Sequence, residues 1–434
     1  MESLSELFKE IESLPKGNVY PKTINGKRYW YHQYFDLGKR YSTLLKEEEV
    51  EPLLEKINRR KALEKEYKLR TKAKDTALSD NARSQTGYIM MGDEVVAIFD
   101  NGNLVSLDEE KSPLILKRTH SLDEFLKLRA IDGSRTNARL LKKALGIKEN
   151  DDSLISLSSY GASISDNFWF KPKHSKLKHK DINFQTDAFA EISLKGETLL
   201  FPGKRKSTPE LTTTGSFEKG WKRIDGEWWL YKQGSQKEIF SELFCYHFAS
   251  LLSLPSAIYE YDAPYIRSKN FATSTNFQPM AALVGDDDSF EAVFKALLSI
   301  SEKTAKEYLL LILFDAIVYN VDRHNENYGL LSDRDSGEIL SLAPSFDCNL
   351  ALISRNDDLP SPSKDGLIKL FLNFATKNQE ARRIYKEMAL PDIQIEEAVN
   401  CIKKIPAELH PTNADKLAEA IVERYLFLKA KFSN

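Results

Sequence analysis

The sequence predicts a multidomain α+β protein. Its 434 residues exceed the length of one ordinary compact domain. Segments with the period of a strand alternate along the chain with segments that have the period of a helix. The longest apolar run, residues 308–319, predicts a buried helix. We expect four parts, at residues 1–75, 85–150, 151–280 and 281–434.

The composition, with 41% hydrophobic and 29% charged residues, is typical of a soluble globular protein. The 62 basic and 64 acidic side chains leave a formal charge of -2, which argues against attraction of the whole chain to nucleic acid or to an anionic membrane. The three cysteines, Cys245, Cys348 and Cys401, lack the spacing of metal ligands, so we expect a reducing, cytoplasmic environment.

Two further features argue against a membrane protein. The first residues lack the basic and apolar regions of a signal peptide. The apolar run at residues 308–319 contains Asp315 and is too short to cross a bilayer.

Residues 1–75 predict a β-hairpin followed by a helix. Asn25 and Gly26 separate two strand-like segments, and Asn-Gly supplies the positive φ angles of a tight turn. Apolar residues on one face predict a helix around residues 50–63. Basic and aromatic residues leave contact with RNA or DNA open, but the mixed charges favour a solvated helix beside a regulatory or dimerising hairpin.

A small α+β module is expected after a polar linker at residues 71–84. Strand-like segments occupy residues 88–91 and 95–99, and a turn at residues 100–103 leads to a third. Helical patterns follow at residues 122–130 and 136–145.

The segment from residue 166 to residue 184 mixes aromatic residues with lysines and with His174 and His179. Two histidines five residues apart, without a supporting pattern of carboxylates, do not make a metal site. We therefore expect a solvated loop here and assign no function to it.

Residues 212–220 form a loop of small residues that could cover a phosphate group. Gly215 would let backbone N–H groups approach phosphate oxygens. The same composition is also typical of a plain loop.

Lys232 ends an aromatic strand-like segment at residues 227–232, and a helical run follows at residues 237–252. Kinases pair a strand lysine with a carboxylate on the next helix to hold the α- and β-phosphates of ATP. Glu242 lies ten residues after Lys232, and Glu238 lies one turn earlier on the same face, so the periodicity leaves both carboxylates open.

The polar segment after the predicted buried helix contains most of the candidate catalytic and magnesium-binding residues. Asp322 precedes Asn327 by five residues, which is the kinase spacing between the catalytic base and an amide that binds magnesium. Asp347 follows a short strand-like segment, and carboxylate and amide oxygens are suitable ligands of Mg²⁺. Asp322 and Arg323 are also typical of turns and salt bridges. Order and spacing therefore leave open both a phosphotransferase and unrelated α/β proteins.

Residues 320–327, N-V-D-R-H-N-E-N, and residues 342–347, L-A-P-S-F-D, resemble the HipA-like serine/threonine kinases. The motifs of that family read N-x-D-R-H-x-x-N and L-A-P-x-[YF]-D. The resemblance extends from about residue 205 to the end. It implies a bilobal protein-kinase-like fold of the HipA type, with residues 151–280 as the N-lobe, residues 281–434 as the helical C-lobe, and an N-terminal α+β extension.

The resemblance also implies a role for each candidate. Asp322 would be the general base, and Asn327 and Asp347 would bind Mg²⁺. Lys232, oriented by Glu242, would contact the phosphates of ATP.

A loop and one histidine complete the implied ATP site. His324 would lie beside the nucleotide. Autophosphorylation of the phosphate-covering loop would expel this loop from the site, because the dianionic phosphate group repels bound nucleotide. The family's loop commonly reads G-x-Q-x-K, whereas Phe217 stands here at the polar position. The loop consists of Thr214, Gly215, Ser216, Phe217, Glu218 and Lys219, and the hydroxyls available for phosphorylation are those of Thr212, Thr214 and Ser216.

Family members often act as toxins that phosphorylate an aminoacyl-tRNA synthetase or another translation factor, and a small DNA-binding antitoxin restrains them. The resemblance therefore implies a protein substrate and such an antitoxin as partners. Two other functions remain open. One is a small-molecule phosphotransferase with the same residues, and the other is a non-catalytic protein that binds nucleic acid or a partner.

Overall fold

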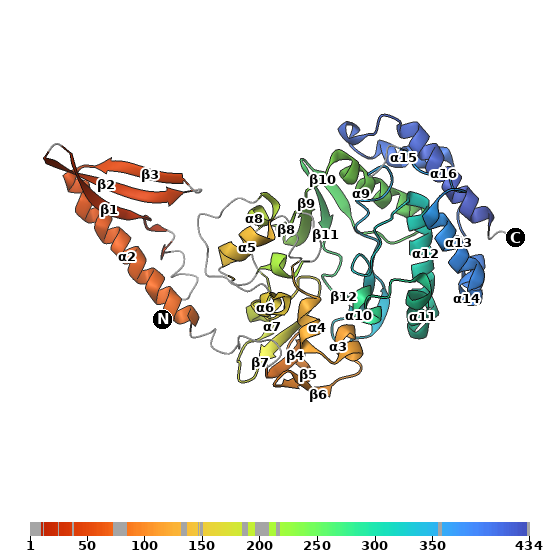
Figure 1. Cartoon of the computed structure of the whole chain (residues 1–434), viewed down its shortest axis with the longest axis horizontal. Coiled ribbons are helices and arrows are strands. Elements are labelled where there is room, and N and C mark those ends of the chain that lie inside the picture. The colour runs from red at the N-terminus through yellow and green to blue at the C-terminus, as the bar shows by residue number, and fades with distance from the viewer. Residues whose placement is uncertain are drawn as a thin grey trace.

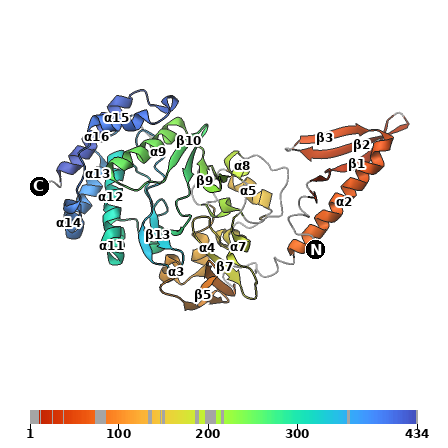
Figure 2. The ribbon, with the colours of Figure 1, turned by 180° about the vertical axis from the view of Figure 1, so that it is seen from behind.

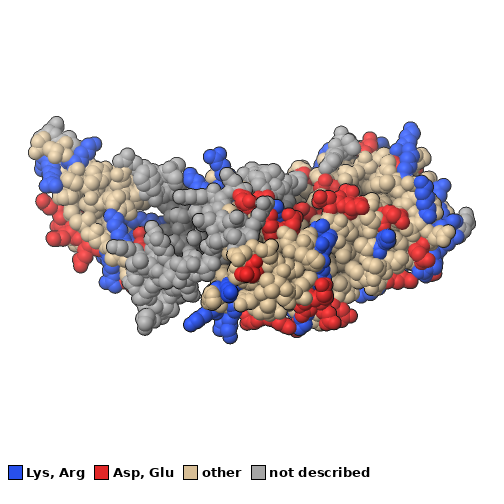
Figure 3. All heavy atoms as spheres, turned by 60° about the horizontal axis from the view of Figure 1, so that its bottom comes forward, with Lys and Arg blue, Asp and Glu red and all other residues tan. Residues whose placement is uncertain are grey.

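The structure of the chain is a computed structural model. It describes residues 10–11, 13–24, 26–36, 39–72, 85–131, 137–145, 147, 151–184, 190–195, 208–213, 218–354 and 358–431. Helices and several small sheets alternate along the described residues, which confirms the α+β class (Figure 1). No helix among these residues is long and apolar enough to cross a bilayer. Acidic and basic side chains are interspersed on the face seen in Figure 3.

The first unit is a three-stranded antiparallel sheet followed by a long helix. Ile24 pairs with Lys27, so the hairpin has the two-residue turn that the sequence predicts. The third strand was not predicted, because its alternation is weak and its described side chains are mostly exposed. Figures 1 and 2 both show this unit apart from the rest of the chain. The elements are β1 (Asn18–Ile24), β2 (Lys27–Asp36), β3 (Lys39–Leu45) and α2 (Glu47–Lys72).

The second unit contains a four-stranded antiparallel sheet with the order β6-β5-β4-β7. Three of its strands and two of its helices match the predicted segments. Its strands are β4 (Gly87–Met91), β5 (Glu94–Asp100), β6 (Asn103–Leu107) and β7 (Phe168–Pro172). In the described part of the chain, four helices lie between β6 and β7 in the sequence, and two more follow β7. They are α3 (Leu114–Thr119), α4 (Leu122–Lys127), α5 (Ala138–Leu145), α6 (Asp152–Leu157), α7 (His179–Ile182) and α8 (Ala190–Lys195).

Strand β7 corrects the prediction of a solvated loop at residues 166–184. Phe168, Trp169 and Phe170 are all buried, because both faces of this strand are covered. A strand buried on both faces has no alternation of apolar and polar residues that the sequence could reveal. The pairing of β7 with β4 also brings a strand from beyond residue 150 into the second unit.

The third unit has a four-stranded sheet with the order β10-β11-β9-β8, and one long helix follows its second strand. The predicted strand at residues 227–232 is β9, and the predicted helix is α9. The elements are the short 3₁₀-helix η2 (Pro209–Thr212), β8 (Lys219–Ile224), β9 (Glu227–Lys232), α9 (Gln236–Ala249), η3 (Ser250–Leu252), β10 (Tyr259–Asp262) and β11 (Tyr265–Lys269).

The last unit is mostly helical, with a small sheet of order β12-β13-β14. The predicted buried helix is α12, whose C-cap Tyr319 has a left-handed φ of 55° and turns the chain toward the candidate catalytic segment. The strands are β12 (Thr275–Pro279), β13 (Gly329–Asp333) and β14 (Ile339–Leu342). The helices are α10 (Met280–Val284), α11 (Phe290–Ile300), α12 (Glu302–Val318), α13 (Gly366–Lys377), α14 (Gln379–Glu387), α15 (Ile395–Lys403), η4 (Ala407–Leu409) and α16 (Ala414–Ala430).

One continuous apolar core holds the second, third and fourth units together. It runs from Ile89 in β4, through the stacked rings of α9, to Leu428 in α16. Burial of apolar surface on this scale is the main stabilising contribution to the fold. The candidate catalytic segments therefore lie on elements that share one core.

Candidate active site

Lys232, the last residue of β9, lies between two carboxylates. Its Nζ donates a hydrogen bond of 3.0 Å to Oε1 of Glu242 in α9 and one of 2.8 Å to Oδ1 of Asp347 after β14. Lys232 and Glu242 are 6% and 1% exposed. Three segments that are far apart in the sequence thus meet at one buried ammonium group.

The start of α9 explains why Glu242, and not Glu238, contacts the lysine. Ser235 and Glu238 form a capping box, in which the Ser235 hydroxyl accepts the N–H of Glu238 and the Glu238 carboxylate accepts the N–H of Ser235 at 2.7 Å. Glu238 therefore caps its own helix. Glu242, one turn later, is left to orient Lys232.

The backbone around Asp347 is fixed from two sides. The N–H of Asp347 donates to the hydroxyl of Tyr259 at 3.0 Å, and the N–H of Cys348 donates to Oε2 of Glu242 at 2.9 Å. Asp347 has a φ of 60°, which a residue with a side chain rarely adopts. Such backbone strain persists only where the surroundings enforce it, and it is frequent at functional sites.

A second lysine adds to the positive charge beside Asp347. Lys219, the first residue of β8, pairs directly with Lys232 in the β8–β9 ladder. Burial alone would raise the pKa of Asp347, but the ammonium groups of Lys232 and Lys219 hold that pKa well below its usual range. Burial would likewise lower the pKa of Lys232, but Asp347 and Glu242 hold it well above its usual range. Asp347 and Lys232 are therefore both ionised near neutral pH.

Arg323 ties the loop after α12 to the segment that carries Asp347. Its guanidinium group donates two bonds of 2.9 Å to both carboxylate oxygens of Asp315 in α12. Nη1 donates to the backbone carbonyls of Asn327 at 2.7 Å and of Phe346 at 2.6 Å. Since the Arg323 and Asp315 side chains are 7% and 4% exposed, this pair forms a buried frame beneath the loop.

Asp322, His324 and Asn327 lie in the loop that this frame supports. Nδ2 of Asn327 donates to the backbone carbonyl of Asp322 at 3.0 Å, so Oδ1 is the side-chain atom of Asn327 that could bind a cation. The N–H of Asp322 donates to Oδ1 of Asn320 at 3.5 Å. Asp322 is half-buried and His324 is exposed.

A pocket of about 140 Å³ lies over these groups. Phe271, Phe277 and Phe346 form one apolar wall, with ring centroids 5.5 to 5.6 Å apart. An apolar wall next to a few convergent charges is the usual form of a small-molecule site. The predicted residues that line the pocket are Thr212, Lys219, Lys232, His324, Asn327 and Asp347.

Other predicted site residues lie outside the pocket wall. Glu242 is buried behind Lys232, and Asp322 is not among the residues that line the pocket. The carbonyl of Glu218 accepts the N–H of Gln233 at 3.0 Å. The predicted loop residues Thr214, Gly215, Ser216 and Phe217 lie outside the described residues.

The sequence did not assign a role to four residues that hold the site: Asp315, Asn320, Arg323 and Tyr259. Asp315 could have been found, because a single carboxylate within a long apolar run needs a buried partner. Tyr259 could not have been found, because only the fold brings it to Asp347.

The oxygen atoms of Asn327 and Asp347 are the candidate ligands of a magnesium ion. Oδ1 of Asp347 accepts from Lys232, so Oδ2 is the oxygen that remains for a cation. Amide and carboxylate oxygens fit Mg²⁺, which often takes one or two protein ligands together with phosphate oxygens and water. Among the described residues, no three His, Cys, Asp or Glu side chains cluster as a metal site of their own.

The chain was compared with known proteins. No protein-family model matches it, and no curated protein matches it. Among solved structures, it is similar to the proinflammatory kinase CtkA of Helicobacter pylori, with 18% identity and a TM-score of 0.39 over 49% of this chain and 94% of that chain. It is also similar to HipA of the Shewanella oneidensis MR-1 toxin–antitoxin system, solved with HipB and operator DNA. That similarity has 15% identity and a TM-score of 0.48, over 80% of this chain and 99% of that chain.

Proposed function

We propose that the chain is an ATP- and magnesium-dependent phosphotransferase, and specifically a serine/threonine protein kinase of the HipA-like type. The observation that carries the proposal is the buried contact of Lys232 with both Glu242 and Asp347. Phosphoryl transfer depends on positioned charges more than on covalent chemistry, and a strand lysine held by a helix glutamate is the kinase arrangement for gripping phosphates.

Each residue would act through its place in the site. Lys232 and Lys219 would bind phosphate oxygens, and the wall of Phe271, Phe277 and Phe346 would take the adenine ring. Asn327 and Asp347 would hold Mg²⁺, which neutralises phosphate charge when it is bound. Asp322 would accept the proton of the substrate hydroxyl.

The test is mass spectrometry of the purified full chain before and after incubation with Mg·ATP. We expect a gain of phosphoryl groups, located at Thr212, Thr214 or Ser216. Asp322→Asn should slow this gain by at least about 100-fold, since loss of a general base typically costs that much. The matched control is Asp415→Asn, which changes an exposed carboxylate of α16 and should leave the rate unchanged.

The result also separates the proposal from its alternatives. A small-molecule phosphotransferase would consume ATP without placing phosphate on protein. A non-catalytic binding protein would do neither, and the absence of ATP binding would overturn the proposal.

The proposed acceptor is a protein hydroxyl, as the family resemblance implies. A translation factor such as an aminoacyl-tRNA synthetase is the acceptor to test first, and a small DNA-binding antitoxin is the partner to test first. The transfer of labelled phosphate to a purified synthetase, absent with Asp322→Asn, is the corresponding measurement.

A further inference from the structure

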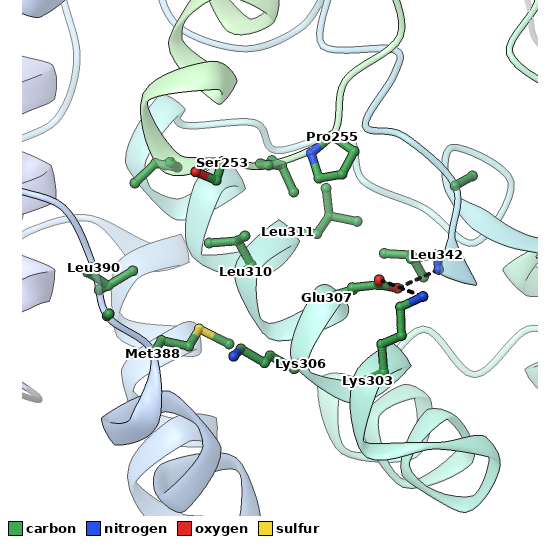
Figure 4. Close-up of a pocket in the computed structure, with 14 residues that line it drawn as sticks. Ser253, Pro255, Lys303, Lys306, Glu307, Leu310, Leu311, Leu342, Met388 and Leu390 are labelled. Carbon is green, nitrogen blue, oxygen red and sulfur yellow. Dashed lines mark hydrogen bonds and ion pairs between the residues drawn. The ribbon is translucent and has the colours of Figure 1, made fainter. Parts of the chain in front are cut away.

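A second pocket, separate from the proposed phosphate site, lies in the helical part of the chain (Figure 4). Its volume is about 470 Å³, within the range of roughly 300–1,000 Å³ that is usual for small-molecule sites. Three segments line it: α12, residues 252–255 at the end of η3 and just after it, and residues 388–390 after α14. The end of β14 completes the wall.

The interior of this pocket is apolar. Leu310 projects from α12 toward the side of Leu390, Leu311 lies near Pro255, and Leu254, which also lines the pocket, is buried. Apolar side chains that surround such a volume favour a hydrocarbon group, because its transfer from water to the pocket is favourable in proportion to the area buried.

One end of the pocket is positively charged. Lys303, Lys306 and Glu307 extend the same face of α12 at the spacing of successive helical turns. Glu307 is already engaged, since Oε2 accepts the N–H of Leu342 at 2.7 Å and Lys303 lies 3.9 Å from Oε1. Lys306 has no ion pair or hydrogen bond with any residue that the structure describes, and its side chain lies beside Met388. The unmatched charge at the rim is therefore a cation.

We propose that this pocket binds an aliphatic carboxylate, a medium-chain fatty acid or a molecule with the same head and chain. The hydrocarbon chain would lie between Leu310, Leu311 and Met388. The carboxylate would be paired with Lys306 at the rim, as charge complementarity requires.

The walls of the pocket are joined directly to the phosphate site. Leu342 and Ala343 begin the segment that ends at Asp347. The N–H of Ser345 donates to the carbonyl of Pro255 at 2.8 Å, and the N–H of Ala257 donates to the carbonyl of Ser345 at 2.9 Å. Two hydrogen-bonded chain segments therefore form a short bridge that leads from the pocket to the Lys232 site. One continues from Ser345 to Asp347, and the other continues from Ala257 to Tyr259.

A bound ligand would stabilise the bridge as it stands in the structure, and with it the position of Asp347. The consequence is positive coupling between the aliphatic carboxylate and Mg·nucleotide, and the coupling must be reciprocal. This part of the inference rests on the proposed phosphotransferase function, whereas binding to the pocket does not.

Binding is tested by calorimetry of the full chain with octanoate, decanoate and dodecanoate, without nucleotide. The affinity should rise about fourfold for each added methylene until the pocket is full. Lys306→Glu should weaken decanoate binding by about tenfold. The affinity for decan-1-ol, which has no carboxylate to pair with Lys306, should not change with this substitution. Lys295→Glu is the matched control, because Lys295 is an exposed lysine of α11 outside the pocket, and it should have no effect.

Three results would overturn the proposal: no binding of any of the acids, an affinity independent of chain length, or equal weakening by Lys306→Glu and Lys295→Glu. Coupling is measured separately, as the affinity for Mg·ADP with and without saturating decanoate. At a decanoate concentration that just saturates the unmodified chain, we expect an increase of about fivefold or more, and Lys306→Glu should reduce this increase. An unchanged affinity for Mg·ADP would refute the coupling, whereas complete absence of Mg·ADP binding would refute the proposed function and leave the decanoate result standing.

Discussion

The side chain of Arg323 joins helix α12, the loop after it and the segment before Asp347. Its two bonds to Asp315 lie in a buried environment, where a single charge left without its partner is costly. We expect Arg323→Met to lower the free energy of unfolding by about 3–5 kcal/mol, as measured by urea denaturation. The double variant Arg323→Met, Asp315→Leu should recover part of this loss, because it removes both charges.

An exposed arginine provides the control for this measurement. Arg383 contacts Glu302, Glu380 and Glu387, but its side chain is 41% exposed. Exposed ion pairs contribute little to stability, so Arg383→Met should shift the urea midpoint only slightly. If Arg323→Met and Arg383→Met lowered the urea midpoint equally, Arg323 would not stabilise the loop as proposed.

Asp347 gives the site a defined dependence of stability on pH. Its pKa in the folded chain is held below the value of about 3.9 expected when the chain is unfolded. The unfolded state therefore takes up more protons in acid, and the stabilisation from Asp347 is present above about pH 4 and is lost as the pH falls further. The pKa of Lys232 is raised, so its contribution is complete below about pH 10 and is lost only at higher pH.

Replacement of Asp347 should flatten this acid dependence. In Asp347→Asn, the slope of unfolding free energy against pH between about pH 2 and pH 4 should be smaller by up to about 1.4 kcal/mol per pH unit, the value for one proton. Urea denaturation at several pH values gives the slope. Glu419→Gln, at an exposed position of α16, should leave the slope unchanged, and an unchanged slope in Asp347→Asn would show that its carboxylate is not held ionised.

At the level of single residues, the sequence predicts candidate site residues, but it does not predict the residues that hold them in place. Asp322, Asn327 and Asp347 belong to short local motifs, and such motifs can be recognised in a single sequence without knowledge of the fold. The choice between Glu238 and Glu242 required the capping box, because helical periodicity places both on one face. Roles that depend on contacts between distant segments, as for Tyr259, cannot be predicted from local patterns.

At the level of elements, helix α12 and strands β9 and β14 were predictable, since their apolar or aromatic patterns are continuous. Strand β7 was not, because its three aromatic residues are buried on both faces beside exposed lysines. The third strand of the first sheet was missed for the opposite reason, since its described side chains are mostly exposed.

Gly329 limits how closely β12 and β13 can approach each other. A Cβ atom at this position would lie 2.1 Å from the carbonyl oxygen of Gln278 in the paired strand. Gly329→Ala should therefore separate the strands and destabilise the protein by about 1–3 kcal/mol. Since Asn327 lies two residues earlier, the same variant should weaken the binding of Mg·ADP, as measured by calorimetry.

Gly366 is the matched control for the glycine substitution. It begins helix α13, and nothing lies within 4 Å of the position that its Cβ would occupy. Gly366→Ala should be neutral or stabilising by about 0.4–1 kcal/mol, because it restricts the unfolded chain. Similar losses of stability for both variants would show that the β12–β13 contact is not the cause.

At the level of the whole molecule, the buried core separates the first unit from the remainder. The apolar clusters of the described residues begin at Ile89 and Met90, and none of them includes Ile11 or Ile57 of the first unit. Figures 1 and 2 show the same separation in space. The boundaries that the sequence predicted between the four parts remain predictions, and a deletion series can test the first of them.

A chain that begins at Gln85 should fold and keep its activity, because the truncation removes no residue from the clusters that surround Lys232 and Asp347. We expect its urea midpoint to equal that of the full chain, and its phosphate incorporation from Mg·ATP to be unchanged. A chain that begins at Gly92 is the control. It lacks β4, which lies between β5 and β7, so the sheet loses its ladders to both neighbours and the chain should unfold at much lower urea. A large loss of stability in the first truncation would mean that β1–β3 and α2 pack on the rest of the protein, and would overturn the predicted division at the linker of residues 71–84.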